Sequence, residues 1–555
     1  MNSIWSESCQ IPERAPLRGN IEAEIAVIGA GLAGILTASL LQNAGRQVVV
    51  LDAGRIAGGQ TRNTTAKITA QHGLIYQKLI RTLGRDSAKQ YAMANEAAIE
   101  EYRRLIEAES IDCSFEERNA YVYGNDSEQL QAEAEAAASL GLPASFVRET
   151  KLPFPTAGAV CFTRQAQFHP LRFLAHIARP LTVYENTPVI TVEENRIETA
   201  GGQVRAEHIV FACHYPFINF QGLFFARMHQ ERSYVLALEN TAQVDGMWIG
   251  TEQGSYSFRN YGNLLLLGGG GHRCGENSAG GKYELLRQAA KKWFPDSREI
   301  AHWSAQDCVT ADSVPHIGRY AENRPHWYVA TGFQKWGMTT SMVSAMLLRD
   351  MICGAKNPCA DVFAPERFDA KTLTGVAAES GQAVKGLAKE LFQIPSEQAA
   401  EIPKGHGGIV FLHGQKVGVY KDEEGRLYPV DIRCPHLGCQ LEWNPDELSW
   451  DCPCHGSRFD RFGKLISGPA QEDLAGGRKF FRFICSFLGK TIPEVIRMRY
   501  VPNASEDFLA ELDRNAPARD RFYTLSEAEQ QRIIVQARSV RDANEMRSLV
   551  NSIRA

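Results

Sequence analysis

The sequence lacks long hydrophobic runs and has no marked excess of charge of either sign. No stretch reaches the roughly 18 consecutive apolar residues of a membrane-spanning helix, so we expect no transmembrane segment. The net charge of −4, without a long basic run, argues against a nucleic-acid partner. Residues 1–16 contain no basic segment followed by an apolar one, which an export signal requires. These absences predict a cytoplasmic protein.

Cysteine, by contrast, is plentiful, with 13 residues in a chain of 555. Eight are scattered through the first 360 residues without metal-like spacing, and we expect these to be small buried hydrophobic residues. Four more fall between residues 434 and 454, where the spacing carries information. The chain is too long for one simple core, so we expect two or three domains.

Residues 21–52 carry the pattern of a buried strand, a glycine-rich turn, a helix and a second strand. The glycines of G-x-G-x-x-G let the backbone turn tightly and approach a pyrophosphate, which the free N–H groups of a helix N-terminus bind. An acidic residue after the second strand can accept hydrogen bonds from both ribose hydroxyls. The alternative is a glycine-rich turn in an ordinary α/β domain. The whole unit favours a dinucleotide site at Gly29, Gly31, Gly34 and Asp52.

The segment AGRIAGGQTRNTTAKITAQHG, at residues 53–73, resembles a loop of the D-amino-acid oxidase and glycine oxidase family of flavoenzymes. In that family a Gly-Gly pair and the following Ser/Thr residues lie along the flavin and its phosphates. The resemblance implies that the cofactor is FAD. The matching positions are Gly58, Gly59, Thr61, Thr64 and Thr65.

Two later stretches extend this resemblance over roughly residues 20–365. HIVFACHYP, at 208–216, is similar to the family's second strand against the adenosine half of the cofactor. WYVATGFQKWGMTTSMVSAMLL, at 327–348, is similar to the strand, turn and helix that point a helix N-terminus at the flavin pyrimidine. There the helix dipole stabilises the negative charge of the reduced ring. The matching residues are Gly332, Gly337, Met338 and Thr339.

The resemblance also implies a large antiparallel sheet over the flavin face in residues 217–310, with the substrate pocket between. Family members that oxidise α-amino acids clamp the substrate carboxylate with an arginine, and the register of WSAQDCVTADSVPHIG puts Asp307 there. A carboxylate repels an α-carboxylate and favours a cation, so we expect an amine or an N-substituted compound. A solvated loop acid is the alternative for Asp307. Tyr256 and Arg259 lie on a strand expected to reach the pocket, where Arg259 binds an anionic tail or forms a surface ion pair.

Two short loops, CPHLGC and CPCHGS, hold four cysteines and two histidines, which is more than one metal site needs. Two cysteines and two histidines suit tetrahedral zinc. The spacing also resembles a Rieske [2Fe–2S] centre, in which the cysteines bind one iron and the histidines the other. The ligands that the resemblance implies are Cys434, His436, Cys452 and His455.

The surplus cysteines, Cys439 and Cys454, fall where respiratory-type Rieske proteins carry a disulfide between the two cluster loops, and a zinc site does not need that pair. The resemblance further implies that Ser457 donates to a bridging sulfide and that Pro469 belongs to a third loop covering the cluster. Phe459 stands where high-potential members have a tyrosine that donates to a ligand sulfur. Loss of that donor predicts an intermediate reduction potential.

The fold class we expect is α/β plus β. In the Rieske region, residues 409–430 read as three short strands. An aromatic and basic segment at 479–489 packs against the protein or, alternatively, touches a partner or membrane. The expected parts are a Rossmann-type FAD-binding domain with its substrate sheet at 1–365, a packed linker at 366–399, an all-β Rieske domain at 400–475 and a helical extension of unknown role at 476–555.

A flavin takes two electrons as hydride, whereas a Rieske cluster carries one at a time. A chain that joins them resembles the bacterial FAD-dependent oxidoreductases with a C-terminal Rieske domain, and its flavoprotein part is similar to gamma-glutamylputrescine oxidoreductase. This favours oxidation of an amine, with electrons leaving through the cluster to a protein or quinone. The alternatives are electron flow from the cluster through FAD to a reducible substrate, and a non-enzymatic redox sensor or carrier.

Overall fold

The computed structural model describes residues 2–218, 222–367, 401–412 and 415–474, and parts of 508–553. By their contacts these residues form two compact units. The first comprises the described residues of Met1–Gln393, Arg433–Asp460 and Leu465–Asp473, and the second those of Ile394–Ile432, Arg461–Lys464 and Leu474–Ala555. The linker expected at 366–399, apart from its first two residues, and the segment 479–489 lie outside the described residues.

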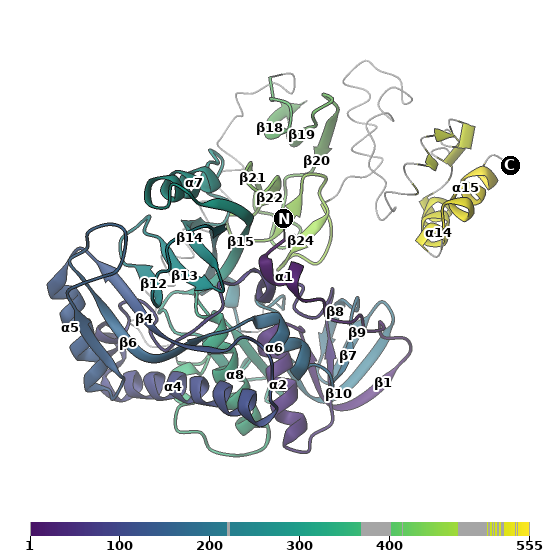
Figure 1. Cartoon of the computed structure of the whole chain (residues 1–555). Helices are drawn as coiled ribbons and strands as arrows, with labels where there is room; N and C mark the ends of the chain where they lie inside the picture. Colours follow the sequence, from purple (N-terminus) through teal and green to yellow (C-terminus); the bar gives the residue numbers. More distant parts are fainter. Residues whose placement is uncertain are drawn as a thin grey trace. The chain divides into compact units, whose positions relative to one another are not determined.

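A mostly parallel, eight-stranded sheet forms one layer of the first unit (Figure 1). Its central strand β1 (Ile21–Ile28) pairs in parallel with β2 (Val48–Leu51) and with β10 (Gly202–Phe211), and β17 (Trp327–Thr331) follows beyond β10. These strands are short apolar runs, as expected where helices cover both faces of a parallel sheet. The other strands are β7 (Thr182–Tyr184), β8 (Val189–Glu193), β9 (Arg196–Thr199) and β16 (His316–Arg319).

A nine-stranded, mostly antiparallel sheet forms the second layer. In it β11 (Met228–Glu239) lies between β14 (Leu264–Arg273) and β15 (Arg298–Thr310) and pairs antiparallel with both. The strands expected within 217–310 are therefore present. The sheet also recruits earlier segments to which the sequence interpretation assigned no strands. Its remaining strands are β3 (Lys67–Ile68), β4 (Glu116–Gly124), β5 (Ala144–Val147), β6 (Gly158–Gln167), β12 (Met247–Gly250) and β13 (Ser257–Tyr261).

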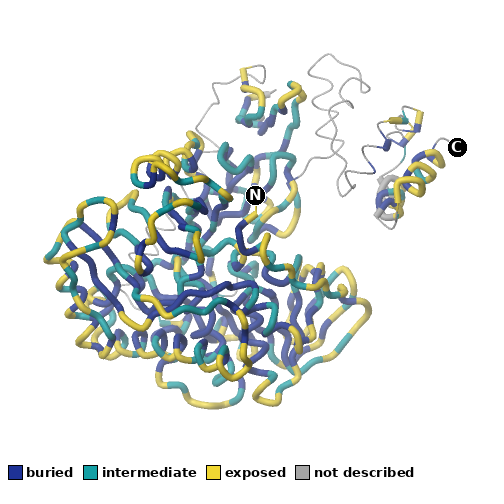
Figure 2. Tube along the Cα trace, viewed as in Figure 1, coloured by how far each residue is buried: buried dark blue, intermediate teal, exposed yellow. Residues whose placement is uncertain are grey.

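Two buried helices fix the cofactor end of the parallel sheet (Figure 2). Helix α2 (Leu32–Asn43) is buried at every position from Leu32 to Leu41 and packs on α8 (Gly337–Ile352). Such all-round burial explains why α2 reads as apolar on every face rather than as amphipathic. The other helices of this unit are α1 (Ile4–Ser8), α3 (Tyr76–Leu83), α4 (Arg85–Ala108), α5 (Ser127–Ser139), α6 (Pro170–Ile177) and α7 (Lys282–Trp293), with 3₁₀ turns η1 (Gln60–Asn63), η2 (Phe224–Ala226) and η3 (Asp361–Phe363).

A small antiparallel sheet from the later part of the chain completes the first unit. Its strands pair in sequence order: β21 (Glu442–Asn444), β22 (Ser449–Asp451), β23 (Arg458–Asp460) and β24 (Leu465–Ser467). The loops that carry the clustered cysteines and histidines adjoin this sheet. The region expected as one domain at 400–475 is thus divided, because these loops group with the residues of the two large sheets and the preceding strands do not.

The second unit contains the three strands expected between 409 and 430. They are β18 (His406–Leu412), β19 (Gln415–Lys421) and β20 (Leu427–Val430), which pair antiparallel around a small core that includes Val410, Val417 and Val419. The same unit holds α14 (Glu527–Arg538) and α15 (Ala543–Ser552), so helices are present in the C-terminal extension. Ser526, the expected capping residue before α14, lies outside the described residues.

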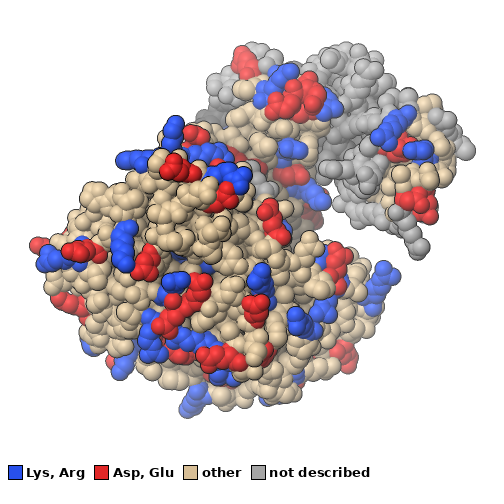
Figure 3. All heavy atoms as spheres, in the orientation of Figure 1, with Lys and Arg blue, Asp and Glu red and all other residues tan. Residues whose placement is uncertain are grey.

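On the face of the molecule that Figure 3 shows, acidic and basic side chains are interspersed. Ion pairs within the described residues include Arg104–Glu101. Within the described part of the chain, no helix combines the length and the apolar character needed to cross a membrane.

Candidate functional site

The G-x-G-x-x-G turn joins β1 to α2 through positions that demand glycine. Gly29 has φ of +110°, and a Cβ there would collide with the carbonyl oxygen of Ala212. A Cβ on Gly34 would collide with the carbonyl oxygen of Gly29, so Gly34 permits close packing of the helix on the strand. Gly31 is the N-cap of α2 and has no side chain to cap it. The positive end of the α2 dipole therefore meets a cavity that Gly29 and Gly31 line.

Asp52, at the end of β2, lines the same cavity. Its carboxylate accepts hydrogen bonds from the backbone N–H groups of Ala30, over 2.6 Å, and Gly54, over 2.7 Å. Burial raises the pKa of Asp52, and these two hydrogen bonds oppose that rise. An ionised carboxylate has about four acceptor positions, so Asp52 retains capacity for the ribose hydroxyls of a nucleotide.

The loop after β2 lines the cavity with all five of its expected residues. The Thr61 hydroxyl accepts a hydrogen bond from the N–H of Leu32 over 3.0 Å, so it caps α2 from the neighbouring loop. The Thr64 hydroxyl accepts one from the N–H of Ala66 over 2.8 Å, which fixes the turn. The lining residues of this loop include Gly58, Gly59, Thr61, Thr64 and Thr65.

Arg259 lies outside the cavity lining. Its side chain is fully buried, is absent from the cavity lining, and donates hydrogen bonds to the carbonyl oxygens of Thr65 and Ala66, the latter over 2.6 Å. Burial lowers the pKa of Arg259 to about 9. This corrects both expectations for Arg259, an anion-binding residue and a surface ion pair, because its guanidinium holds the cofactor loop from behind. Tyr256, on the same segment, does line the cavity.

The turn after β17 places three of four expected residues in the cavity wall. Gly332 adopts φ of +72°, and Gly337 and Met338 begin α8 at the cavity. Thr339 is different, since its hydroxyl accepts from the N–H of Thr69 over 2.8 Å and donates to the Thr69 carbonyl over 2.9 Å. Thr339 is fully buried and does not line the cavity, so it joins α8 to β3 rather than facing the flavin.

The cavity that these elements enclose has a volume of about 1610 Å³. This exceeds the roughly 300–1,000 Å³ of pockets for drug-sized ligands, so it has room for a dinucleotide and a substrate together. The antiparallel sheet supplies part of the wall. Residues 465–472, including Pro469, supply another part. The loop expected to cover the metal cluster therefore also borders the cofactor cavity.

A row of charged residues crosses three neighbouring strands of the antiparallel sheet and lines the cavity. Glu231 of β11 lies directly opposite Asp307 of β15 on one side and Arg273 of β14 on the other. Directly opposed residues share one face of a sheet. Lys335, from the turn before α8, forms an ion pair with Glu231 over 3.2 Å. The row therefore brings two carboxylates together, and only Glu231 has a lysine paired with it in the described residues.

The two carboxylates differ in their acidity. A hydrogen bond from His229, together with Lys335, lowers the pKa of Glu231 to about 2 against the effect of burial. Burial raises the pKa of Asp307 to about 7, with Lys335 opposing this rise and the Glu231 carboxylate adding to it. Two like charges in one site push their pKa values apart. The carboxyl group of Asp307, with a pKa of about 7, therefore lies beside a carboxylate whose pKa is far lower.

The expected metal ligands come together at the ends of the small sheet. The imidazole rings of His436 and His455 are 4.9 Å apart between centroids, and the thiol groups of Cys434 and Cys452 hydrogen-bond one another. The Sγ atoms of Cys439, Cys452 and Cys454 also lie within 4.8 Å of one another, but Cys439 and Cys454 form a disulfide and cannot bind a metal. Two cysteines and two histidines remain as the candidate ligand set.

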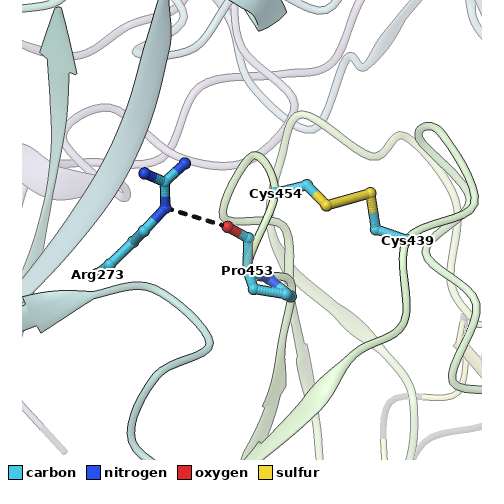
Figure 4. The surroundings of a disulfide bond; sticks show 4 residues. All are labelled: Arg273, Cys439, Pro453 and Cys454. Carbon is cyan, nitrogen blue, oxygen red and sulfur yellow. Dashed lines mark hydrogen bonds between the residues drawn. A yellow bond between two sulfur atoms is a disulfide. The ribbon is translucent and has the colours of Figure 1, made fainter. Parts of the chain in front are cut away.

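The disulfide between Cys439 and Cys454 joins the two cluster loops, with 6.5 Å between the Cα atoms, and confirms the expected pair (Figure 4). The Ser457 hydroxyl accepts a hydrogen bond from the N–H of Ala470 over 3.0 Å, and it also forms a hydrogen bond with the Cys434 side chain. Phe459 is fully buried in β23. The roles of Ser457 and Phe459 toward the cluster stay predictions.

The cluster loops are seated on the antiparallel sheet by direct contacts. Gln230 donates from Nε2 to the carbonyl of His455 over 2.6 Å, and Gln306 donates from Nε2 to the carbonyl of Gly456 over 2.8 Å. The Nε atom of Arg273 donates to the carbonyl of Pro453 over 3.4 Å, as Figure 4 shows. A Cβ on Gly456 would lie 2.7 Å from the Cβ of Gln230, so the loop approaches the strand as closely as glycine permits.

Both cofactors suit the residues present. The three glycines leave a cradle that Cβ atoms would obstruct, and the N-terminus of α2 and Asp52 face it, which fits the phosphates and ribose of FAD. For the cluster, neither ring nitrogen of buried His455 forms a hydrogen bond of good geometry with the described residues, and the backbone of Phe225 reaches the ring. Buried polar atoms in native proteins are normally satisfied, and a metal bond would satisfy one of them. The disulfide beside the four ligands fits a Rieske centre better than zinc.

Comparisons with known proteins agree with both halves of the site. The family described as FAD dependent oxidoreductase matches residues 24–351, and the Rieske [2Fe-2S] domain matches residues 393–479. The Rieske 2Fe-2S iron-sulfur protein YhfW of Bacillus subtilis (strain 168) is 36% identical over 491 residues, which are 85% of this chain and 96% of that protein. The cytochrome b6-f complex iron-sulfur subunit 1 of Cyanophora paradoxa is 32% identical over 126 residues, 22% of this chain and 50% of that protein.

Solved structures resemble the flavoprotein part. L-proline dehydrogenase from P. horikoshii superposes with a TM-score of 0.52 at 17% identity, covering 64% of this chain and 98% of that one. Glycine oxidase from Geobacillus kaustophilus gives 0.51 at 19% identity, covering 63% and 100%. At such identities the likeness shows the fold, and the fold does not define the substrate.

Several residues of this site were not identified from the sequence. Glu231, Lys335, Gln230, Gln306 and Tyr215 all lie in the cavity wall or at the seat of the cluster loops. Lys335 lies within the turn FQKWG. Because this turn was expected to lie at the flavin, the sequence could have identified Lys335 as a candidate site residue. Glu231 gave none, because its partner depends on the register between strands about 75 residues apart in sequence.

Proposed function

We propose, because the chain belongs to the FAD-dependent oxidoreductase family and carries a C-terminal Rieske [2Fe–2S] domain, that it oxidises an amine or another N-substituted small molecule and passes the electrons singly to an external protein or quinone. The observation that carries the choice of substrate is the position of Asp307. It faces the cofactor cavity directly opposite a second carboxylate, with no lysine or arginine paired to it among the described residues.

Bound FAD supplies hydride acceptance and the bound cluster supplies one-electron transfer. The residues that would hold FAD are those of the α2 turn, Asp52, the 58–65 loop and the start of α8. The residues that would hold the cluster are Cys434, His436, Cys452 and His455. The loop containing Pro469 would separate the two sites, since it lines the cavity and follows the cluster-binding sheet.

Asp307 binds and deprotonates the substrate ammonium in this proposal. An amine loses hydride from its α-carbon only when the nitrogen lone pair is free, so the bound ammonium must first give up its proton. A carboxylate with a pKa of about 7 is matched to that transfer near neutral pH. The proton moves from the substrate nitrogen to a carboxylate oxygen of Asp307 and then to water in the cavity.

Glu231 and Lys335 set the electrostatics around Asp307. Their ion pair is internally neutral, so the site presents the charge of Asp307 to the ligand. An α-carboxylate placed beside Asp307 would meet two carboxylates, and the guanidinium of this row, Arg273, donates to the carbonyl of Pro453, which disfavours free α-amino acids. Tyr256 lines the same cavity and offers a hydroxyl to the substrate. A cytoplasmic location for this reaction stays a prediction.

The test is anaerobic mixing of the oxidised holoenzyme with a panel of primary, secondary and N-methylated amines, each compared with the corresponding α-amino acid. We expect flavin absorbance to bleach with amines and not with the carboxylated counterparts, and the cluster EPR signal to rise afterwards. Dithionite serves as the positive control for both cofactors. Failure of every amine to bleach a flavin that dithionite does bleach would overturn the proposal. Bleaching only by reduced carriers through the cluster would favour the reverse direction of electron flow.

A further inference from the structure

Tyr215 lies between the cofactor cavity and the cluster loops. It belongs to the turn after β10, where Ala212, Cys213, His214 and Tyr215 line the cavity. The centroid of the buried Tyr215 ring is 6.2 Å from the centroid of the His455 ring. Within the described part of the chain, Tyr215 is the aromatic residue that both lines the cavity and has a ring contact with His455. Its packing therefore connects the two cofactor sites without an intervening element.

The turn that carries Tyr215 is held in place. His214 adopts φ of +68°, an uncommon conformation for a residue other than glycine, which persists only when surrounding contacts impose it. The carbonyl of His214 accepts hydrogen bonds from the Thr331 hydroxyl over 2.6 Å and from the Cys308 thiol over 3.4 Å. Thr331 ends β17 immediately before the turn to α8, and Cys308 follows Asp307 in β15. The turn is thus fixed to the two elements that border the expected flavin.

The two histidine ligands have different surroundings. His455 is 3% exposed and packs against Tyr215 and against Phe225, whose ring centroid lies 6.0 Å away. His436 is half-buried and remains partly accessible to solvent. The flavoprotein part therefore encloses one ligand of the cluster and leaves the other partly open. This asymmetry gives the cluster an inner side, at His455, and an outer side, at His436.

Two glutamines hold the inner side in register with the cavity wall. Gln306 donates to the carbonyl of Gly456 and also to the side-chain oxygen of Gln230, which in turn donates to the carbonyl of His455. The backbone N–H of Gln306 donates to the side chain of Gln60, which lines the cavity in the cofactor loop, over 2.8 Å. A chain of hydrogen bonds thus runs from the cofactor loop to the backbone of the ligand His455. Buried networks of this kind rigidify the groups that they join.

We propose that electrons pass between the flavin and the cluster through Tyr215 and His455, and that Gln230 and Gln306 are positioning residues that keep these two rings in contact. This inference rests on the proposed function for the source of the electrons, but its route holds for either direction of flow. A fixed contact of this kind makes the cluster a resident partner of the flavin rather than a carrier that must move to reach it.

The electrons and protons balance over one turnover. Hydride from the neutral amine leaves an iminium product and a flavin that carries two electrons and one proton more than before. Each passage through Tyr215 and His455 moves one electron and reduces one ferric iron of the cluster to ferrous iron. The cluster returns to its oxidised form by giving that electron to the external protein or quinone. Two passages restore FAD and release its proton to the cavity water.

The experiment uses the holoenzyme without any amine, so that it does not depend on the substrate. The protein is fully reduced with dithionite, freed of excess reductant, and mixed anaerobically with ferricyanide as the one-electron oxidant. Cluster reoxidation and flavin reoxidation are followed separately by EPR after rapid freezing and by flavin absorbance. A Cys452→Ser variant that lacks the cluster gives the rate at which ferricyanide oxidises the flavin directly, and this rate is subtracted.

We expect Tyr215→Leu to slow flavin reoxidation several-fold toward the cluster-free rate, with cluster reoxidation, cluster EPR signal and cluster potential unchanged. Tyr215→Phe keeps the ring and should match the wild type. Phe225→Leu is the matched control, because Phe225 also contacts His455 but does not line the cavity, and it should leave both rates unchanged. Gln230→Leu should also slow flavin reoxidation. It provides a second test in case the Tyr215→Leu protein does not fold.

Unchanged flavin reoxidation in a Tyr215→Leu protein that retains both cofactors overturns the inference, as does equal slowing by Phe225→Leu. If Tyr215→Leu does not retain both cofactors, Gln230→Leu is used instead, and unchanged flavin reoxidation in that variant overturns the inference. A slowed Tyr215→Leu enzyme whose flavin no amine bleaches would leave this route standing and remove the proposed substrate class. If amines bleach the flavin but Tyr215→Leu has the wild-type rate of flavin reoxidation, the proposed substrate class stands and the electron route is wrong.

Discussion

Arg232 and Glu447 form a buried ion pair, with 2.9 Å between Nη2 and Oε2, that joins the antiparallel sheet to the cluster-binding sheet. Their side chains are only 1% and 12% exposed. Glu447 also accepts hydrogen bonds from Ser304 over 2.7 Å and from Tyr283 over 2.8 Å, and Arg458 lies 3.3 Å away. A buried charge so fully surrounded fixes position more than it adds net stability. The pair therefore registers the cluster loops on the flavoprotein.

Replacing Glu447 with Gln should weaken this seat strongly, because Arg232 and Arg458 would remain buried without their shared carboxylate. We expect a loss of about 3–5 kcal/mol in the free energy of unfolding. The measurement is a urea titration in which unfolding is monitored by the cluster EPR signal. Lys151→Met is the comparison, since the exposed pair Lys151–Asp245 should contribute under about 1 kcal/mol. Equal effects of the two changes would show that the buried pair has no special role.

The rate of amine-dependent flavin reduction should follow the ionisation of Asp307. With a pKa of about 7, Asp307 accepts a proton only above that pH, so the pseudo-first-order rate constant at low substrate should rise about tenfold per pH unit below pH 7 and level off above it. Asp307→Asn should abolish this rise and lower the plateau. Glu231→Gln should keep a pH-dependent limb, moved to lower pH by the loss of the neighbouring negative charge. A wild-type limb retained in Asp307→Asn would exclude Asp307 as the proton acceptor.

The ionisation of Asp307 should also affect the stability of the fold. The rate of flavin reduction rises with pH, whereas the contribution of Asp307 to stability falls. The unfolded chain ionises Asp307 above about pH 4, whereas the folded protein keeps it protonated up to about pH 7, so its contribution falls as pH rises through this interval and is constant above it. A rise in pKa from 3.8 to about 7 corresponds to at most about 4 kcal/mol. Asp307→Asn should therefore stabilise the cofactor-free protein more at pH 8 than at pH 4.

Glu231→Gln provides the opposite sign for comparison. The pKa of Glu231 is lowered to about 2 in the folded protein, so its ionised form stabilises the fold above about pH 4.5 and this contribution is lost as pH falls toward 2. The Gln variant should accordingly be less stable than the wild type at pH 8, measured by chemical denaturation. Shifts of the same sign in both variants would contradict the assignment of the two carboxylates.

Arg259 should act on FAD retention rather than on substrate affinity. Arg259→Met removes hydrogen bonds to the Thr65 and Ala66 carbonyls, each worth about 1.5–3 kcal/mol when the donor is charged. We expect faster loss of FAD on dialysis and a lower thermal midpoint. Arg259→Lys, which keeps the charge but not the planar fork, should fall between. A variant with normal FAD content and a raised KM for the amine would restore the original expectation for Arg259.

The disulfide should stabilise the cluster loops rather than the flavin site. It closes a separation of 15 residues, for which the loss of chain entropy in the unfolded state predicts about 3 kcal/mol. The double variant Cys439→Ser/Cys454→Ser should lose iron and EPR signal at lower urea than the wild type, while FAD content is little changed. Reduction of the wild type with a thiol is the matched treatment. Unchanged iron retention in both would count against this role.

The sequence was sufficient for the parts of the site that depend on local pattern. Glycines with fixed spacing, a strand ending in Asp52, and the two Cys/His loops each need a backbone geometry that only a few residues define, and in the structure the glycines and Asp52 line one cavity while the two Cys/His loops come together. Three strands in 409–430 and the Cys439–Cys454 pair were likewise predictable. These features are encoded within segments of a few dozen residues, where turn and strand chemistry operate.

Contacts between distant segments were not predictable in this way. Arg259 is on a strand expected to reach the pocket, but its guanidinium donates to the carbonyls of Thr65 and Ala66 and does not line the cavity. Thr339 begins a helix at the cavity yet turns toward Thr69. The opposition of Glu231 and Asp307 depends on strand register, and the pair Arg232–Glu447 joins residues 215 positions apart. Such relationships follow from tertiary packing, which a single sequence does not reveal.

The wall that residues 465–472 contribute to the cofactor cavity has a consequence for maturation of the protein. The cavity is complete only when the iron–sulfur loops are folded, so each cofactor binds the form of the chain that the other one favours. By linkage, insertion of iron and sulfide should tighten the hold on FAD, and FAD should slow the escape of iron. Cells starved of iron would then accumulate a yellow polypeptide that loses FAD more readily than the fully loaded protein.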